Sequence, residues 1–146
     1  MKDLVFKIML LSLCAGATEV IKEGDAYPIE KIREQNQQII KMVVAEISKT
    51  LPQRVDKYTQ LTKIHDENIT LVYTFEINSK TKSDERIKRE DHFRMQKSVT
   101  KGACQSSKRF LDAGVELLYE YISATTHKEL FAFHITQTIC REFSYE

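Results

Sequence analysis

The spacing of the hydrophobic residues changes at about residue 52, and this change constrains the fold more than any other feature of the chain. Between Pro28 and Pro52 the apolar side chains recur every three or four residues, which is the period of an amphipathic helix: Ile29, Ile32, Ile40, Val43, Ile47 and Leu51. Pro28 suits the first turn of a helix and Pro52 prevents its continuation. The sequence therefore predicts a long N-terminal helix whose apolar stripe needs a covering surface.

Beyond Pro52 the period becomes two, which is typical of strands with one apolar face. In the segment 68–78 the alternating apolar residues are Ile69, Leu71, Tyr73, Phe75 and Ile77. The segment 58–64 predicts a weaker strand, and the polar residues 65–68 join the two as a hairpin. The segments 115–123 and 129–137 predict two more strands around the turn 124–128. One face of this pair carries Val115, Leu117, Tyr119, Tyr121, Phe131, Phe133 and Ile135.

The segment 83–103 is rich in charge and fits two structures. Ser83 or Asp84 suits the cap of a helix, and Met95, Val99 and Ala103 then share one face. A strand is the alternative, because Phe93, Met95 and Val99 also fit an alternating pattern. The helix is favoured, since long charged side chains have good helix propensity.

A short helix is expected to open at Cys104 and to end at Gly114, a natural residue for a left-handed cap. The chain contains no repeat, low-complexity segment or linker, which indicates one domain. The expected fold is α+β, with a long N-terminal helix and one or two further helices packed on an antiparallel sheet of about four strands.

The N-terminus resembles an export signal. Lys2 and Lys7 flank a basic start, residues 8–14 are mainly apolar, and residues 15–17 read Ala-Gly-Ala. The apolar run is too short to span a bilayer. We expect residues 1–17 to be a cleaved signal peptide and residues 18–146 to form the single mature domain. The alternative is a buried N-terminal strand or helix, which Asp3 in the basic region favours.

Cys14 offers a second interpretation of this segment, because lipoprotein signals end at a cysteine that is acylated. The residue before that cysteine is normally small, and here it is Leu13. A lipid anchor at Cys14 is therefore the less favoured alternative.

Removal of the signal leaves two cysteines, Cys104 and Cys140. An even number of cysteines in an exported protein predicts one disulfide. Closing a loop of this length stabilises the folded state by roughly 3–4 kcal/mol in the chain-entropy model. Two free buried thiols are the alternative if the signal is not one. The expected location is the periplasm or the cell exterior.

The order of these features resembles a known family. A cysteine, a short segment ending in glycine, a tyrosine-rich strand, a turn, an apolar strand and a final cysteine are arranged as in the β-type pilotins of type II secretion systems. The resemblance covers residues 59–140, and its distinctive residues are Cys104, Gly114 and Cys140. It implies helices packed on an antiparallel sheet, a disulfide between these two places, and binding of the tail of a secretin.

Other functions find little support in the sequence. The formal net charge is +1, and the charges of 80–101 are of mixed sign without an aromatic platform, so nucleic acid is not an expected partner. His65, His92, His127 and His134 do not have metal-ligand spacing, and the segment 65–67 is a polar turn. The serine–lysine pairs 79/82 and 98/101 lack the accompanying motifs of serine acylases. We expect no catalytic residue, metal or cofactor.

The sequence therefore predicts a non-catalytic periplasmic protein-binding module, with a pilotin-like secretion accessory as the specific candidate. The alternatives are a secreted inhibitor or immunity protein that blocks an enzyme, and an enzyme of unrecognised type. The expected working surface is a groove between the helix 28–51 and the sheet, which takes a helical segment of a protein client. Ile39 and Val44 lie beside the main stripe of this helix and are the predicted partner-binding residues.

Overall fold

A computed structural model describes residues 28–144 of the chain. The predicted signal segment 1–17 and the candidate lipid site Cys14 lie outside the described residues. The elements in chain order are α1 (Ile29–Ser48), β1 (Gln53–Arg54), β2 (Thr59–Glu67), β3 (Thr70–Ile77), α2 (Asp84–Ser106), α3 (Lys108–Asp112), β4 (Glu116–Ser123), β5 (Glu129–Ile135) and α4 (Gln137–Phe143).

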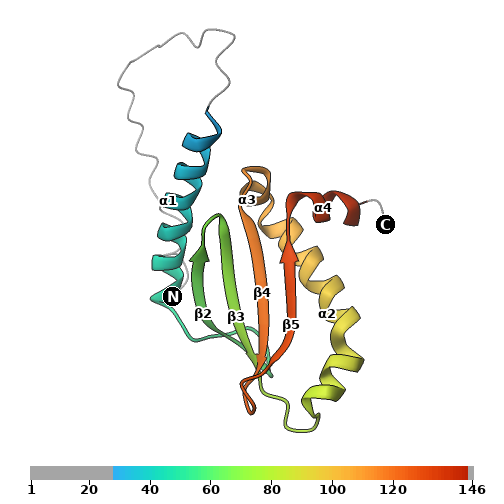
Figure 1. The fold of residues 1–146 in the computed structure, drawn as a ribbon. Coiled ribbons are helices and arrows are strands. Elements are labelled where there is room, and N and C mark those ends of the chain that lie inside the picture. Colours follow the sequence, from blue (N-terminus) through green and yellow to red (C-terminus); the bar gives the residue numbers. More distant parts are fainter. Residues whose placement is uncertain (1–27, 145–146) are drawn as a thin grey trace, which may run out of the picture.

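The five strands form one sheet in the order β1-β2-β3-β4-β5, as Figure 1 shows for the four longer ones. The α+β class is confirmed, and the two predicted strand pairs, β2–β3 and β4–β5, are antiparallel. The sheet differs in two details from the expected antiparallel sheet of about four strands. The short β1 adds a fifth strand, and β3 runs parallel to β4. The reason is the connection, since α2 and α3 carry the chain back to the end of the sheet at which β3 began.

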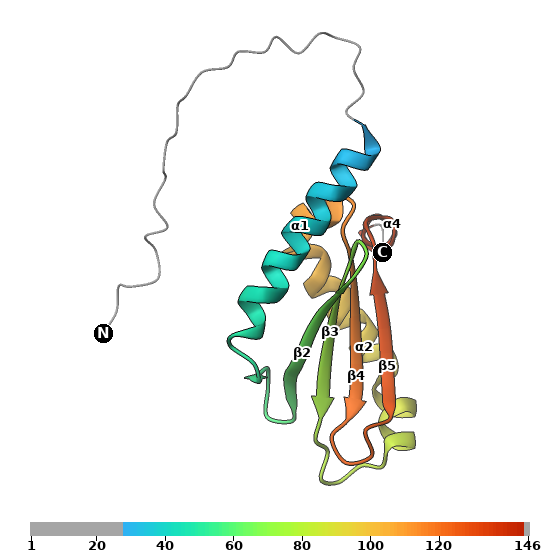
Figure 2. The ribbon, with the colours of Figure 1, turned by 60° about the vertical axis from the view of Figure 1, so that its left-hand side comes forward.

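One face of the sheet is packed against helices. The strand register places Leu71 beside Leu117 and Leu117 beside Ile135, and each of these side chains is at most 1% exposed. Ile40 of α1 and Ile87 of α2 belong to the same apolar cluster as these strand residues. The core is therefore a single layer between the sheet and two helices. The first turns of α1 project beyond the end of the sheet (Figures 1 and 2).

The charged segment after β3 is helical, as favoured from the sequence. The hydroxyl oxygen of Ser83 accepts a hydrogen bond from the backbone N–H of Arg86 (3.3 Å), and acidic residues occupy the first turn. α2 continues through Gly102 to Ser106. The expectation that Cys104 opens a separate short helix is therefore wrong, because Cys104 lies in the last turn of α2. The short helix α3 begins four residues later, after the non-helical Ser107.

The disulfide between Cys104 and Cys140 is confirmed, with the two Cα atoms 5.5 Å apart. It joins the end of α2 to α4, a helix that was not expected from the sequence. The side chain of Thr136 caps α4 by accepting a hydrogen bond from the backbone N–H of Ile139. The expected left-handed conformation at Gly114 is also present, with φ of +88°.

Candidate functional site

The two long helices pack on the same face of the sheet, over different strands. α1 packs on β2 and β3, whereas α2 packs on β5, and Figures 1 and 2 show them along different edges. The central strands β3 and β4 carry an aromatic strip between the helices, which consists of Tyr73, Phe75, Tyr119 and Tyr121. Tyr73 and Tyr119 are only half-buried. The middle of this face is therefore covered by aromatic side chains and not by a helix.

The aromatic strip is ordered by the strand register. Tyr73 lies opposite Tyr119 with ring centroids 5.1 Å apart, and Phe75 lies opposite Tyr121 at 4.8 Å. Stacked pairs at these distances add stability beyond the burial of their area, on the order of 1 kcal/mol each. The strip is therefore a preformed and rigid surface.

The phenol groups of this strip are harder to ionise than an exposed tyrosine. Burial, together with the negative charge of Asp56, raises the pKa of Tyr121 to about 12. Burial also raises the pKa of Tyr119 and of Tyr73. These tyrosines consequently provide apolar rings and uncharged hydroxyl groups.

A cleft of about 480 Å³ opens at one end of the aromatic strip, between α2 and the ends of β2 and β3. Its apolar lining consists of Tyr58, Ile77, Ile87, Met95 and Phe131. We call this space the α2 cleft. Tyr58 is 51% exposed at its mouth, whereas Phe131 is buried at its base. Concave apolar surface of this kind on an otherwise charged molecule is typical of a binding site.

The rim of the α2 cleft carries paired charges. Lys82 Nζ lies 3.0 Å from Asp91 and 3.2 Å from Glu90, and Arg94 lies 3.0 Å from Asp91. Burial pushes the pKa of Asp91 upward, but hydrogen bonds from Arg94 and Lys82 outweigh it and hold the pKa below its ordinary value. Hydrogen bonds to Asp91 and Glu90 raise the pKa of Lys82. The rim is thus ionised at neutral pH, and its opposite charges are paired.

The two predicted partner-binding residues lie on different sides of α1. The neighbour of Ile39 one turn earlier, Asn36, donates a hydrogen bond from Nδ2 to the carbonyl oxygen of Ala113 (2.7 Å), just before β4. Ile39 is 45% exposed and lies one turn from this bond, on the side of α1 toward the turn after α3. Val44 is half-buried against the core. It lies on the same side of α1 as Gln37, which donates a hydrogen bond to Asn68 in the β2–β3 turn.

The α2 cleft was not predicted from the sequence. Its lining comes from the start of β2, the end of β3, α2 and β5, which are far apart in the chain. The signal that could have indicated a binding surface is the set of tyrosines on one face of two strands, because such a face needs a cover or a ligand.

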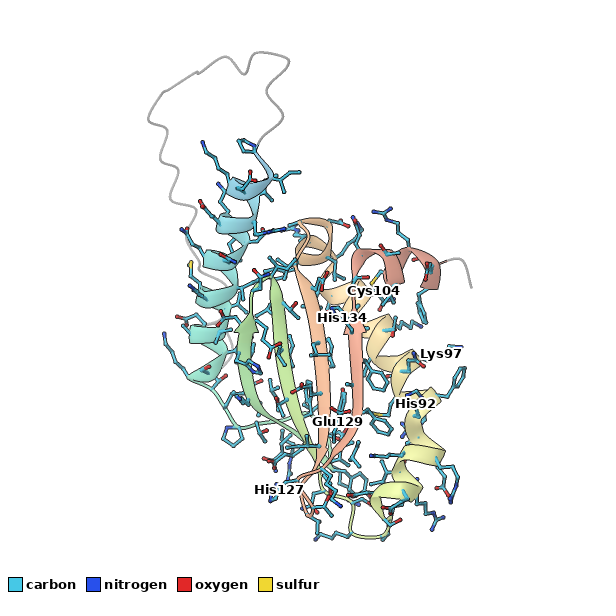
Figure 3. The ribbon with its side chains drawn as sticks, viewed as in Figure 1. His92, Lys97, Cys104, His127, Glu129 and His134 are labelled. Carbon is cyan, nitrogen blue, oxygen red and sulfur yellow. A yellow bond between two sulfur atoms is a disulfide. The ribbon has the colours of Figure 1, made fainter. Side chains whose placement is uncertain are left out.

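The histidines are dispersed over the fold. His65 is on β2, His92 on α2, His127 in the β4–β5 turn and His134 on β5, and Figure 3 labels the last three. His134 Nε2 lies 2.7 Å from Glu116, and His65 Nε2 lies 3.1 Å from Glu67. Between residues 28 and 144 no group of three or more His, Cys, Asp or Glu side chains is placed to hold a metal ion. No helix in that same range is long and apolar enough to cross a membrane.

Neither serine–lysine pair forms a catalytic arrangement. The Lys82 ammonium binds Asp91 and Glu90, while the hydroxyl oxygen of Ser79 accepts the backbone N–H of Lys82 (3.0 Å). Ser98 and Lys101 lie within α2, where Lys101 is exposed. These positions are accounted for by capping and by the solvent-facing surface of a helix.

Comparisons with known proteins show what the fold is similar to. No family model matches the chain, and no curated protein matches its sequence. A presumed secreted protein from Pseudomonas aeruginosa has a similar structure, with a TM-score of 0.66 at 14% identity over 81% of this chain and 100% of that one.

Two pilotins are similar to nearly the same degree. EpsS, from the type 2 secretion system of Vibrio vulnificus, has a TM-score of 0.64 at 11% identity over 76% of this chain and 96% of its own. AspS, from the type II secretion system of Vibrio cholerae, has a TM-score of 0.62 at 12% identity over 76% and 97%. The resemblance to pilotins that was noted in the sequence is therefore confirmed, and at these identities it establishes the fold: this chain has the fold of the two pilotins.

Proposed function

We propose that this protein is an exported, non-catalytic binding protein of the secretion-accessory kind, and that it holds an amphipathic helix of a client protein. The client helix lies over the aromatic strip and inserts apolar side chains into the α2 cleft. The periplasm or the cell exterior is the proposed location. The presumed secreted neighbour and the two secretion pilotins support both the location and the class of function.

The observation that carries this proposal is the half-buried aromatic strip between two helices that pack on different strands. A helix is about 10 Å wide with its side chains and buries one apolar stripe, which is the shape that a sheet flanked by two helices accepts. Rings of Tyr73 and Tyr119 offer contact area with little loss of side-chain entropy. The charges of Lys82, Asp91 and Arg94 on the rim of the α2 cleft are already paired with one another, so they need no partner from the client.

In this proposal Ile39 and Val44 remain the partner-binding residues of α1. Ile39 contacts the client directly, because it is 45% exposed and lies one turn from Asn36, which is bonded to Ala113. Val44 also packs against the core, so its substitution affects both binding and stability. Ile39 is therefore the residue on which the proposal is best tested.

The test is capture of a client from periplasmic extract by the immobilised protein and by two variants. Ile39→Asp places a charge on the binding side of α1 and is expected to reduce capture at least tenfold, which corresponds to about 1.4 kcal/mol. Ala45→Asp places the same charge on the exposed side of the same helix and is expected to leave capture unchanged. Both variants are expected to keep the melting temperature within a few degrees, because both positions are exposed.

The captured protein also separates the secretion role from the inhibitor or immunity role. A secretin or another secretion component, identified by mass spectrometry, supports the accessory function. An enzyme whose activity falls on binding supports the alternative. Equal capture by the wild type, Ile39→Asp and Ala45→Asp contradicts the assigned surface.

A further inference from the structure

The helix α4 is held to the domain by few non-covalent contacts. It has seven residues, none of them buried, and a helix this short is not stable alone. A hydrogen bond from Gln137 Nε2 to Asp112 Oδ1 (3.1 Å) connects it to α3, whereas the hydrogen bond from the Ser144 hydroxyl to the Cys140 carbonyl stays within the helix. The disulfide to Cys104 is its covalent attachment to the end of α2.

Two cavities flank α4. One, of about 660 Å³, lies between α4, α3 and the end of α2 and is lined by both cysteines. The other, of about 320 Å³, lies between α4 and the outer side of α2 and is lined by Phe93, Thr100 and Ile139. Phe143 borders both cavities. Both spaces are open to solvent, so α4 is bordered by open surface on two sides.

The larger cavity gives access to the disulfide in a basic environment. Cys104 and Cys140 are half-buried, and Lys101, Lys108, Asp112 and Arg141 line the same cavity. Asp112 pairs with Lys108, so Lys101 and Arg141 leave a net positive charge beside the disulfide. Figure 3 shows Cys104 at the end of α2 below α4. Nearby cations stabilise an attacking thiolate and a departing one, and partial exposure together with positive charge distinguishes reactive cysteines from inert ones.

We propose that Cys104–Cys140 is an exchangeable disulfide that locks α4 in place, and that a dithiol reductant releases α4 while the rest of the domain stays folded. A thiolate of the dithiol attacks one cysteine sulfur, the S–S bond breaks, and the other cysteine leaves as a thiolate that takes up a proton. The second thiol of the dithiol then displaces the first cysteine from the mixed disulfide. Two electrons pass from the dithiol to the protein, which ends with two thiols, and the reductant ends as a disulfide.

Release of α4 changes the surface of α2 on the side away from the α2 cleft. The two cavities merge, and Thr100 becomes accessible beside Phe93, whose side chain is already 76% exposed. Release of α4 therefore widens the notch at this place into an open groove along α2, where Phe93 and Thr100 lie beside the polar residues Gln96 and Lys97. The compartment's supply of dithiols thus controls a second surface, separate from the client site.

Hydrogen–deuterium exchange of the oxidised protein and of protein reduced with dithiothreitol tests the release. We expect the amides of residues 137–144 to exchange about tenfold faster or more after reduction, while peptides from β3, β4 and α1 keep their protection. Unchanged exchange in 137–144 overturns the proposal, because α4 is then held by its packing. Loss of protection throughout the domain also overturns it, because the disulfide then stabilises the whole fold.

The rate of reduction tests the basic environment with a matched pair of variants. Lys101→Gln removes a cation that lines the disulfide cavity, and Lys97→Gln makes the same change one helical turn earlier, beside the other cavity. We expect Lys101→Gln to slow reduction by dithiothreitol about threefold and Lys97→Gln to leave the rate unchanged. Equal rates for the two variants, or reduction that occurs only in denaturant, overturn the proposal.

Discussion

Replacement of Asn36 by alanine removes one of the bonds that position the projecting part of α1. Asn36 is 7% exposed, and its Nδ2 donates to the carbonyl oxygen of Ala113 at 2.7 Å across a sequence separation of 77 residues. Ala113 directly precedes Gly114 and the start of β4. The bond therefore fixes the distance between α1 and the central strands, and with it the position of Ile39.

The expected loss of stability follows from three contributions. A side chain–backbone hydrogen bond contributes about 1 kcal/mol net, and removal of the buried amide leaves a small cavity that adds a similar amount at most. Alanine recovers about 0.5 kcal/mol through its higher helix propensity. The free energy of unfolding should fall by about 1–1.5 kcal/mol, and the melting temperature by roughly 5 °C.

Urea unfolding followed by circular dichroism measures this change, and an unchanged m-value shows that the unfolded state is not altered. Gln37→Ala is the matched control, because Gln37 is the next residue on the same helix and its hydrogen bond to Asn68 is exposed. This control should change stability by less than about 0.5 kcal/mol. If Asn36→Ala and Gln37→Ala have the same effect, the bond to Ala113 does not fix α1 and the reasoning is wrong.

Two further predictions concern glycines and the disulfide. Gly102 lies inside α2 and Gly114 has φ of +88°, and an added Cβ has no heavy atom within 4 Å at either position. Gly102→Ala should therefore stabilise the protein by about 0.5–1 kcal/mol, and Gly114→Ala should destabilise it by about 1–2 kcal/mol. If thermal unfolding shows a change of the same sign for both variants, the assigned backbone conformations are wrong. Cys104→Ser opens a loop of 36 residues and should lower the free energy of unfolding by about 2–4 kcal/mol. The lower part of this range is expected if α4 alone is released. If the urea midpoint is unchanged both in the variant and in reductant, the bridge does not stabilise the protein.

The α+β class and most of the elements could be predicted from the sequence because their signals are local. The spacing of the isoleucines and valines before Pro52 specifies α1, and the alternation from Ile69 to Ile77 specifies β3. Gly114 marked a left-handed turn because other residues rarely adopt that conformation. Two cysteines in a chain with an export-like start predicted the bridge, since the pairing of the only two candidates needs no knowledge of the fold.

The continuation of α2 through Cys104 was not predictable in the same way. Gly102, Ser106 and Ser107 are poor helix formers, so the local sequence gives no sign that α2 continues through Cys104. In the folded protein Thr100 and Ala103 are buried, and Ala103 belongs to the apolar core; this burial outweighs the weak local preference. Propensity gives only tenths of a kcal/mol per residue, whereas burial of a side chain gives one or more.

The sequence by itself determined the α+β class, the positions of most helices and strands and which of their faces are apolar, because these properties depend on neighbours within a few residues. It also determined which cysteines pair, because Cys104 and Cys140 are the two that remain after the predicted signal. Only the tertiary structure decided that β3 and β4 run parallel, that Ile39 is exposed while Ile40 is fully buried, and that Tyr58, Met95 and Phe131 share one cleft. Each of these depends on contacts between segments that are distant in the chain. Such contacts are set by how the helices and the sheet pack as whole bodies, and the period of a single segment carries no information about its partner.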